Sequence, residues 1–460
     1  DRVMKKSMDM CSGPLASKIL LFTVPVMLTN LLQLFYNTAD IVVLGHMGSN
    51  LSVGAVGATS TVITLIVNTF MGLSVGVNVA AAQAIGAKNL KEARNTVQTS
   101  ALLGLICGLL ATLVGLIASP AILGMMKTPE RTLPLAILYI RVYFLGAPAN
   151  LLYNFLAGLL RAKGETKFPL YVLAGSGALK LLLTALFTGL LKLDAAGAAA
   201  ATVVSQYASA AVMVVFLMKR DDEIKLTVKN IKLNGKKAWE IIKIGVPSGV
   251  QGSVFALSAM VIQSAVNSFG DTFITGNTAA GSIDSISYAF HNAFSYTVIS
   301  FVAQNKGAGN YGRIKKSVAY CLMMGAAAAI ITGGLVVLFS HSLMELYIPR
   351  KEEAISYGII RLKYLCIPYF LLAAMDVMSG ALRGLGSALP PALISLAGAC
   401  GLRILWIYTV FERFKTPETL YLSFPVTWGM TFLALLVYYV ILLRKNEKIS
   451  VGFDKDQKKA

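Results

Sequence analysis

Long apolar stretches dominate the chain and alternate with short polar connections. Twelve such stretches can be recognised, and each is long enough to cross the ~30 Å hydrocarbon core of a bilayer as a helix. They lie at 15–43, 52–82, 95–119, 133–159, 168–191, 196–218, 239–268, 273–303, 316–340, 354–381, 389–411 and 420–443. Because backbone groups in lipid must be hydrogen-bonded internally, the pattern predicts an all-α polytopic membrane protein with twelve transmembrane helices.

The second half of the chain repeats the first. Gly158–Pro169 aligns with Gly380–Pro391 at a shift of 222 residues, and Gln83–Asn89 aligns with Gln304–Asn310 at a shift of 221. A near-constant shift indicates duplication, and six helices in each copy make the two copies parallel in the membrane. The predicted parts are an N-terminal lobe at 1–218, a cytoplasmic linker at 219–237, and a C-terminal lobe with a cytoplasmic tail at 238–460.

Composition and charge fit this interpretation. Charged residues make up 14% of the chain, against about 25% in soluble domains, which excludes a soluble globular enzyme. The net charge of +19 comes from basic residues that gather in alternate connections, so it indicates orientation in a membrane and no nucleic-acid partner. We therefore expect a bacterial cytoplasmic-membrane protein with both termini in the cytoplasm.

Apart from bases at the predicted cytoplasmic ends of the stretches, five basic residues lie inside them. Arg141, Arg361 and Lys363 are near the outer ends of their stretches, where we expect long side chains to snorkel to the interface. Lys180 and Arg403 lie near the middle of theirs and occupy equivalent positions in the repeat. A charge at that depth is costly unless it is paired or hydrated, so both should face the bundle interior or a wet cavity.

Apart from Glu240 at the first turn of its stretch, three acids lie inside the stretches: Asp40, Asp284 and Asp376. Asp40 could contact headgroup water, although four more apolar residues follow it. Asp284 and Asp376 could form a structural ion pair with Arg403 that holds three helices together. The functional interpretation is that these acids bind a proton or a cation in a cavity.

Helical spacing adds to the case for the eighth stretch. Asp284, Tyr288, His291 and Asn292 follow one another at i, i+4, i+7 and i+8, so they form a polar stripe on one face. A polar stripe on an apolar membrane helix must face protein or water. We therefore predict contact with substrate or a proton relay along this face.

Motifs for catalysis are missing from the sequence. It contains no HExxH, Walker A or GxSxG motif, and its five cysteines form no CxxC pair. We therefore expect no enzyme activity, no cofactor and no disulfide framework. Because no nucleotide-binding motif is present, uphill transport would use an ion gradient or a partner ATPase. Buried titratable groups in a duplicated scaffold are the profile of a secondary transporter.

Several stretches together resemble the multidrug and toxic compound extrusion (MATE) family, in the branch common in Gram-positive bacteria. The resemblance implies two lobes in a V shape around a central cavity, a monomer, and H⁺ or Na⁺ entering as an organic cation or drug leaves. The matching stretches are Leu34–Gly45, Gln83–Asn89, Gly245–Gly249, Gln304–Asn310, Ser379–Gly386 and Leu402–Phe411.

The resemblance also implies site residues. Asp40 matches the first-helix acid, and Asp376 matches the tenth-helix acid of this branch. Asp284 stands where the branch usually has Glu in helix eight, and Arg403 matches the arginine of helix eleven. The kinking proline matches Pro25. Its equivalent in the repeat is Pro247, and we expect both prolines to act as hinges while the lobes rock about the 219–237 linker.

Helix five departs from the family pattern. MATE members often carry an Asn and, one turn later, an Asp there, which complete a Na⁺ site with the first-helix acid. Here Lys180 and Thr184 hold those places, and an ammonium beside Asp40 would repel Na⁺. We therefore expect no firm metal site, with Asp40 and Thr184 as ligands only if Na⁺ binds the N-terminal lobe. Our hypothesis is that Lys180 pairs with Asp40.

Other functions remain open at this stage. A flippase for lipid-linked oligosaccharide or another lipid precursor, on the same broader fold, would favour a cationic cavity, to which Lys180 and Arg403 would contribute. The three acids argue against it. An intramembrane enzyme of prenyl-lipid metabolism would need clustered Asp for Mg²⁺, and none is found. A purely structural protein would have no reason to keep three buried acids.

Overall fold

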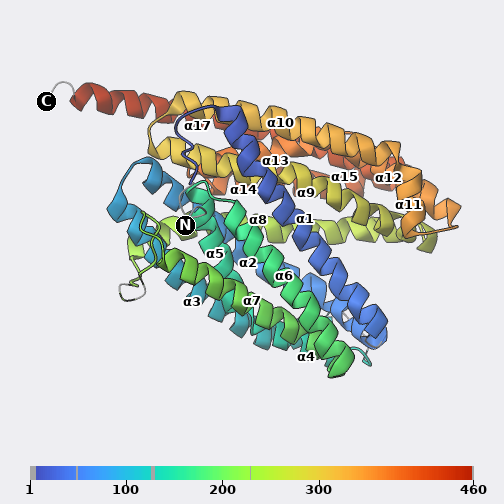
Figure 1. The fold of residues 1–460 in the computed structure, drawn as a ribbon. Helices are drawn as coiled ribbons and strands as arrows, with labels where there is room; N and C mark the ends of the chain where they lie inside the picture. The colour runs from blue at the N-terminus through green and yellow to red at the C-terminus, as the bar shows by residue number, and fades with distance from the viewer. Residues whose placement is uncertain (1–6, 48–49, 126–129, 228, 230, 458–460) are drawn as a thin grey trace. The chain divides into compact units, whose positions relative to one another are not determined.

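The computed structural model describes residues 7–47, 50–125, 130–227, 229 and 231–457, and over these residues it is built from helices and contains no strand (Figure 1). The description is limited to the backbone at 37–42, 44–47, 50–54, 58, 61, 256–257 and 449–457. The predicted all-α class is confirmed.

The chain forms two compact units, which we describe separately. Unit 1 contains Leu28–Ser253 and the described residues up to Asp9, and unit 2 contains Met10–Met27 and Val254 onward. The predicted linker and residues 238–253 thus belong to unit 1, whereas residues 10–27 belong to unit 2. That the two lobes move as separate bodies stays a prediction.

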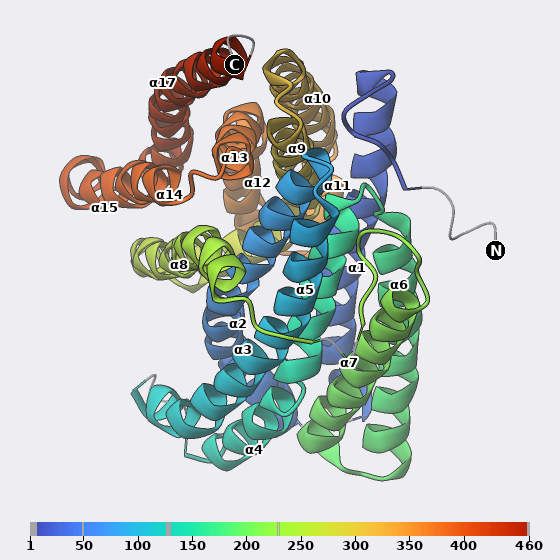
Figure 2. The ribbon, with the colours of Figure 1, turned by 90° about the vertical axis from the view of Figure 1, so that its left-hand side faces the viewer.

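Unit 1 is a helical bundle whose α2, α3 and α5 pack closely together, with α6 and α7 side by side (Figures 1 and 2). Its elements are the later part of α1 (Leu15–Met47), α2 (Asn50–Gly86), α3 (Leu90–Met125), α4 (Leu133–Phe144), α5 (Ala147–Ala162), α6 (Lys167–Ala185) with the π-helical turn η2 (Leu186–Leu190), α7 (Asp194–Met218) and the first part of α8 (Gly235–Asn267).

Unit 2 is centred on α9, which packs against α10, α12 and α13. Its elements are the first part of α1, the last part of α8, α9 (Asp271–Gly307), α10 (Tyr311–Leu338), α11 (Ser340–Tyr347), α12 (Glu352–Cys366), α13 (Tyr369–Gly384), α14 (Leu389–Ser395), η4 (Leu396–Leu402), α15 (Arg403–Trp406), η5 (Ile407–Phe411), α16 (Glu412–Phe414) and α17 (Pro417–Gln457).

The predicted stretches correspond closely to these helices. Within the described part of the chain, nine helices are long and apolar enough to cross a membrane, and the bent pairs α4–α5 and α12–α13 would raise the number to eleven. Pro148 and Pro368 lie at the two bends, of 45° and 46°, because proline interrupts helical hydrogen bonding. The stretch predicted at 273–303 is α9, an uninterrupted helix. Because polar side chains line it, α9 is not among the helices apolar enough to cross a membrane by composition alone.

Two pairs of glycines bring α8 against α2 inside unit 1. They are Gly72 and Gly76 of α2, and Gly245 and Gly249 of α8. A Cβ atom on Gly72 would lie 2.1 Å from the backbone nitrogen of Gly249, and one on Gly249 would lie 2.1 Å from the carbonyl oxygen of Thr69. Glycines four residues apart let membrane helices approach to backbone contact. The first part of α8 is therefore fixed to α2.

The start of α1 is fastened to unit 2 by its backbone. Arg313 of α10 donates to the carbonyl oxygens of Met10, Ser12 and Gly13, at 2.8, 2.7 and 3.0 Å. The amide of Met10 donates to Gln304 of α9 at 2.9 Å. The segment before α1 is thus held as part of unit 2.

An ion-pair cluster holds the predicted linker to unit 1. The buried guanidinium of Arg220 donates to Asp222 and, at 2.7 Å, to Glu165 in the turn before α6. Lys163 of the same turn pairs with Glu223. Burial alone would raise the pKa of Asp222, but the hydrogen bonds and charge of Arg220 outweigh it and hold this pKa below its usual value.

We expect Arg220→Met to lower the stability of unit 1 by about 2 kcal/mol at neutral pH, because Glu165 and Asp222 lose their buried partner. An acid with a depressed folded-state pKa stabilises above its unfolded pKa of about 3.9, and the stabilisation is lost as pH falls through the folded value. The deficit of the variant should therefore narrow below about pH 4. Thermal unfolding in detergent at several pH values measures it.

Lys225→Met is the matched control, since its partner Asp221 is 90% exposed and such pairs contribute little. Equal destabilisation by the two variants would contradict a special role for Arg220.

Candidate functional site

The polar stripe predicted on the eighth apolar stretch exists on α9, but its members have different surroundings. Asp284 and His291 are buried, at 6% and 1% exposure, whereas Tyr288 is 39% exposed and Asn292 is half-buried. The stripe therefore has two members inside unit 2 and two nearer its surface. The acid of the stripe, Asp284, is therefore one of the two members inside the unit.

Asp376 of α13 lies against the outer members of the stripe. The Asn292 amide donates to the Asp376 carboxylate at 3.4 Å and to the Tyr288 hydroxyl at 2.8 Å. The Tyr288 hydroxyl lies near Asp376, and Ser295 donates to the backbone carbonyl of Asp376 at 3.0 Å. Asp376 is half-buried, so its carboxylate is held in place yet reachable. Such a carboxylate can take up a proton or attract a cation.

Asp284 is paired with Arg361 of α12. The guanidinium donates twice to one carboxylate oxygen, from Nε at 3.1 Å and from Nη2 at 2.8 Å. Its Nη1 donates to the Asn277 oxygen at 2.7 Å, which also accepts from the Tyr421 hydroxyl at 2.8 Å. The prediction that Arg361 snorkels was wrong, because Asp284 on the neighbouring helix α9 offers it a partner inside the unit. Arg141 and Lys363 are exposed.

Arg403 does not pair with either acid. Its Nη2 donates to Thr427 at 3.0 Å, and its guanidinium lies over the Phe424 ring, 4.1 Å from the centroid. Among the described residues no carboxylate oxygen lies within 4 Å of this side chain, which is 6% exposed. The alternative that Asp284 and Asp376 form an ion pair with Arg403 is therefore contradicted. The prediction that Arg403 faces the interior was correct.

His291 lies in a row of aromatic rings. Its ring centroid is 5.2 Å from that of Tyr288 and 5.1 Å from that of Tyr369, and Tyr369 is 5.8 Å from Trp428. Trp428 in turn lies beside Arg403, with 6.0 Å between the guanidinium carbon and the ring centroid. The row connects α9, α13 and α17 in unit 2. Its packing explains why a histidine is tolerated there, and a relay role stays a prediction.

The equivalent places in unit 1 carry less charge. Asn154 is the repeat equivalent of Asp376, and its amide donates to the carbonyl and side-chain oxygens of Asn150, at 2.8 and 2.7 Å. Thr184 is buried and donates to the carbonyl of Lys180 at 2.8 Å. The side chain of Asp40 lies outside the described residues, so its pairing with half-buried Lys180 stays a prediction.

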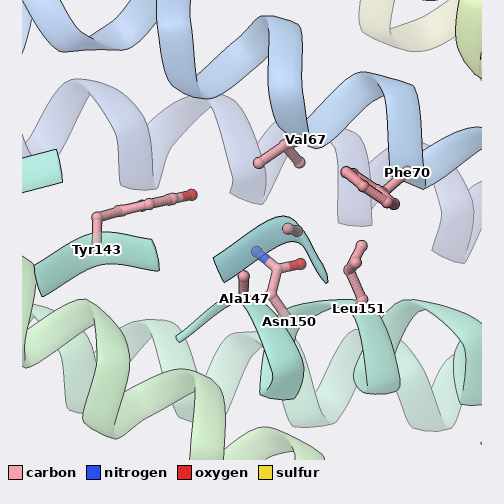
Figure 3. A pocket seen from close by; sticks show the side chains of 7 residues that line it. Val67, Phe70, Tyr143, Ala147, Asn150 and Leu151 are labelled. Carbon is pink, nitrogen blue, oxygen red and sulfur yellow. The ribbon is translucent and has the colours of Figure 1, made fainter. Parts of the chain in front are cut away.

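Unit 1 also contains a small, largely apolar hollow (Figure 3). Val67 and Phe70 of α2 face Asn150 and Leu151 of α5 across it, and Tyr143 of α4 lies at one side. None of the residues predicted from the sequence lines this hollow. It offers no carboxylate, so it does not compete with Asp376 as an ion site.

The sequence did not identify Arg361, Asn277 and Tyr421 as the hydrogen-bonded group around Asp284. One signal was available, since Asn277 lies seven residues before Asp284 and so extends the polar stripe of α9 by two turns. Arg361 and Tyr421 come from other helices, and no spacing in the sequence joins them to α9. In the described part of the chain, no group of three His, Cys, Asp or Glu side chains could hold a metal ion.

Curated proteins of known family resemble the chain over most of its length. It is 27% identical to the probable multidrug resistance protein YpnP of Bacillus subtilis, with 94% of this chain and 97% of that protein aligned. It is 23% identical to the multidrug export protein MepA of Staphylococcus aureus strain MSSA476, over 86% of this chain and 87% of MepA. It is 22% identical to the probable multidrug resistance protein NorM of Thermotoga maritima, over 86% of each.

Solved structures show the same fold. A MOP-superfamily transporter from Pyrococcus furiosus superposes with a TM-score of 0.90 at 20% identity, over 96% of this chain and 99% of that chain. A multidrug resistance MATE transporter in an outward-facing conformation also gives 0.90 at 20% identity, over 97% and 99%. The MatE family model matches residues 25–186 and 247–409, one match in each repeat. The chain therefore belongs to the MATE family of multidrug efflux transporters, which are not enzymes.

Proposed function

We propose that this protein exports organic cations or amphiphilic drugs in exchange for a coupling cation, by alternating access. The observation that carries the proposal is Asp376. Its carboxylate is half-buried, fixed by Asn292, and close to an aromatic row that suits flat organic cations. A proton and a cationic substrate would compete for this one carboxylate, and the competition couples their movements.

The arrangement favours H⁺ over Na⁺. A hard metal cation prefers several oxygen ligands at once. The Asp376 carboxylate instead accepts a hydrogen bond from the Asn292 amide, which is a donor. A proton needs only the carboxylate itself.

Movement would turn on α1 and α8. The division between the units falls after Met27 in α1 and after Ser253 in α8, so each helix has one part in each unit. Pro25 and Pro247 lie shortly before these points, inside their helices. Proline removes a backbone hydrogen bond and loosens a helix locally, which supports these residues as hinges. The 219–237 segment is held in unit 1 and is a poor pivot.

We also propose that the protein is a monomer in the bacterial cytoplasmic membrane with both termini in the cytoplasm. The excess of Lys and Arg in alternate connections supports this orientation.

Reconstituted protein tests the coupling. Proteoliposomes loaded with a fluorescent organic cation are given either a pH gradient or a Na⁺ gradient, each without the other. We expect the pH gradient alone to drive transport of the dye. Transport driven only by Na⁺ would contradict proton coupling, and no transport with either gradient would contradict cation-coupled export.

Arg403 favours a second candidate, a flippase for a lipid precursor with an anionic headgroup. This buried guanidinium has no carboxylate partner among the described residues, so it could receive a phosphate oxygen. Movement of a fluorescent lipid pyrophosphate between leaflets in the same vesicles, without a need for either gradient, would favour this function over drug export.

A further inference from the structure

Asp284 and Asp376 of unit 2 differ in how tightly neighbouring side chains hold their carboxylates. The Asp284 side chain is 9% exposed, and its partner Arg361 is 19% exposed. Arg361 is itself held by Asn277, which is held by Tyr421, so four side chains from three helices form a closed hydrogen-bonded group. This group fixes the guanidinium on the Asp284 carboxylate.

Other titratable side chains surround both acids. Cys366, Tyr369 and Tyr421 lie near Asp284, and Arg361 is the cation among them. Tyr288, Tyr296 and Arg383 lie near Asp376. Asp284 therefore has a cation in direct contact through two hydrogen bonds, whereas the Asp376 carboxylate accepts from the neutral amide of Asn292.

We infer that Arg361 locks Asp284 as a permanently ionised structural pair, so that Asp376 is the single carboxylate of unit 2 that exchanges a proton or cation. Protonating Asp284 would leave the enclosed guanidinium of Arg361 without its counter-charge, which is strongly unfavourable in a buried place. Protonating Asp376 leaves no directly bonded cation uncompensated. Arg361 is thus a positioning residue that decides which acid takes part in coupling, and this assignment rests on the proposed function.

The repeat supports the assignment. Arg141 is the equivalent of Arg361 in unit 1, and it is exposed. At the equivalent of Asp284, 221 residues earlier, unit 1 has Ile63. Where the acid is missing, the arginine turns outward, so the buried position of Arg361 depends on Asp284.

Neutral replacement of the pair tests the inference. Arg361→Gln and Asp284→Asn alone should each lower the melting temperature, because each leaves one buried charge without its partner. The double variant Asp284→Asn/Arg361→Gln should recover stability, because two amides can hydrogen-bond each other. It should also transport with the pH profile of the wild type. A folded double variant that loses gradient-driven transport, or whose pH profile shifts, would overturn the inference.

Chemical labelling of the unaltered protein gives an independent answer. A hydrophobic carbodiimide reacts with protonated carboxyl groups inside membrane proteins and leaves a stable acylurea that peptide mass spectrometry detects. Near neutral pH we expect labelling at Asp376 that increases as the pH is lowered, and none at Asp284. Labelling of Asp284 at a similar level would refute the lock even if the double variant did not fold.

The labelling result does not depend on transport. If no gradient drives export but Asp284 stays unlabelled, the proposed function fails and the lock stands. If the gradient drives export and Asp284 is labelled, the lock fails and the proposed function stands.

Discussion

Replacing Gly249 with alanine should destabilise unit 1 by about 2 kcal/mol or more, although the change adds a single methyl group. That carbon would lie 2.1 Å from the carbonyl oxygen of Thr69 and 2.9 Å from its carbonyl carbon. Both are backbone atoms of α2 that no side-chain rotation can move. The helices α2 and α8 would have to separate. The close contacts of Gly72 and Gly76 with the backbone of α8 would then be lost as well.

Gly252→Ala is the matched control for this prediction. It is the same substitution on the same part of α8, but its new carbon meets only the Cβ of Asn68, at 3.8 Å, which is ordinary contact. Alanine also favours a helix over glycine, so this variant should be as stable as the wild type or slightly more stable. Fluorescence-detected size exclusion and thermal unfolding in detergent measure both. Equal behaviour of the two variants would show that the close approach at Gly249 contributes nothing.

The repeats have diverged at the positions of these α2 glycines. At 221 residues after Gly72 and Gly76, α9 has Ala293 and Thr297, and Thr297 shares a hydrogen bond of 2.8 Å with Thr23 of α1. Unit 1 thus holds the first part of α8 by backbone contact, and unit 2 holds the first part of α1 by side chains.

The fold could be predicted from the sequence because the bilayer imposes it. Each crossing must be helical and about 20 residues long, so apolar length alone located the helices, and a constant shift revealed the duplication. The bends at Pro148 and Pro368 divide predicted stretches into helix pairs without moving their ends. Among the described helices at the predicted stretches, α9 differs in composition. Its polar stripe makes it less apolar than a helix exposed to lipid needs to be.

The site could be predicted only in part. Spacing along one helix showed that Asp284 and Asn292 share a face, because the helical repeat fixes that relation. Which side chain on another helix meets each of them depends on how the helices pack, and sequence spacing holds no such information. Arg361 lies near one end of its stretch, where snorkelling is the default expectation, and only the packing of α12 on α9 shows that an acid is within its reach.

The ion pair of Asp284 changes how the acids should be read as a set. Three acids in the apolar stretches suggested several coupling groups. One of them is neutralised by Arg361 and one lies outside the described side chains, so the exchangeable charge that the structure describes in unit 2 is Asp376. Its equivalent in unit 1 is Asn154, which cannot titrate. Duplication therefore supplied a symmetric frame, and at this pair of positions only the second copy carries an acid.

Replacing Asp376 with asparagine should reduce gradient-driven export to the level of protein-free vesicles. Asparagine has nearly the same shape and can still hydrogen-bond Asn292, and the contact from Ser295 is to the backbone, so the local structure should persist. What disappears is the negative charge and the ability to bind a proton. Both steps of the proposed exchange need that charge, because the substrate and the proton are each attracted by it.

The matched control is Asp271→Asn, which makes the same change at an exposed acid in the first turn of α9 and should transport normally. Equal melting temperatures of the wild type and the Asp376→Asn variant would show that a loss of transport is not a loss of folding. Binding of the fluorescent cation to detergent-solubilised protein should also become independent of pH in the Asp376→Asn variant, because the competing proton has lost its site. Full transport by that variant would move the coupling chemistry out of unit 2 and leave Asp40 and Lys180 of unit 1 as the residues to test.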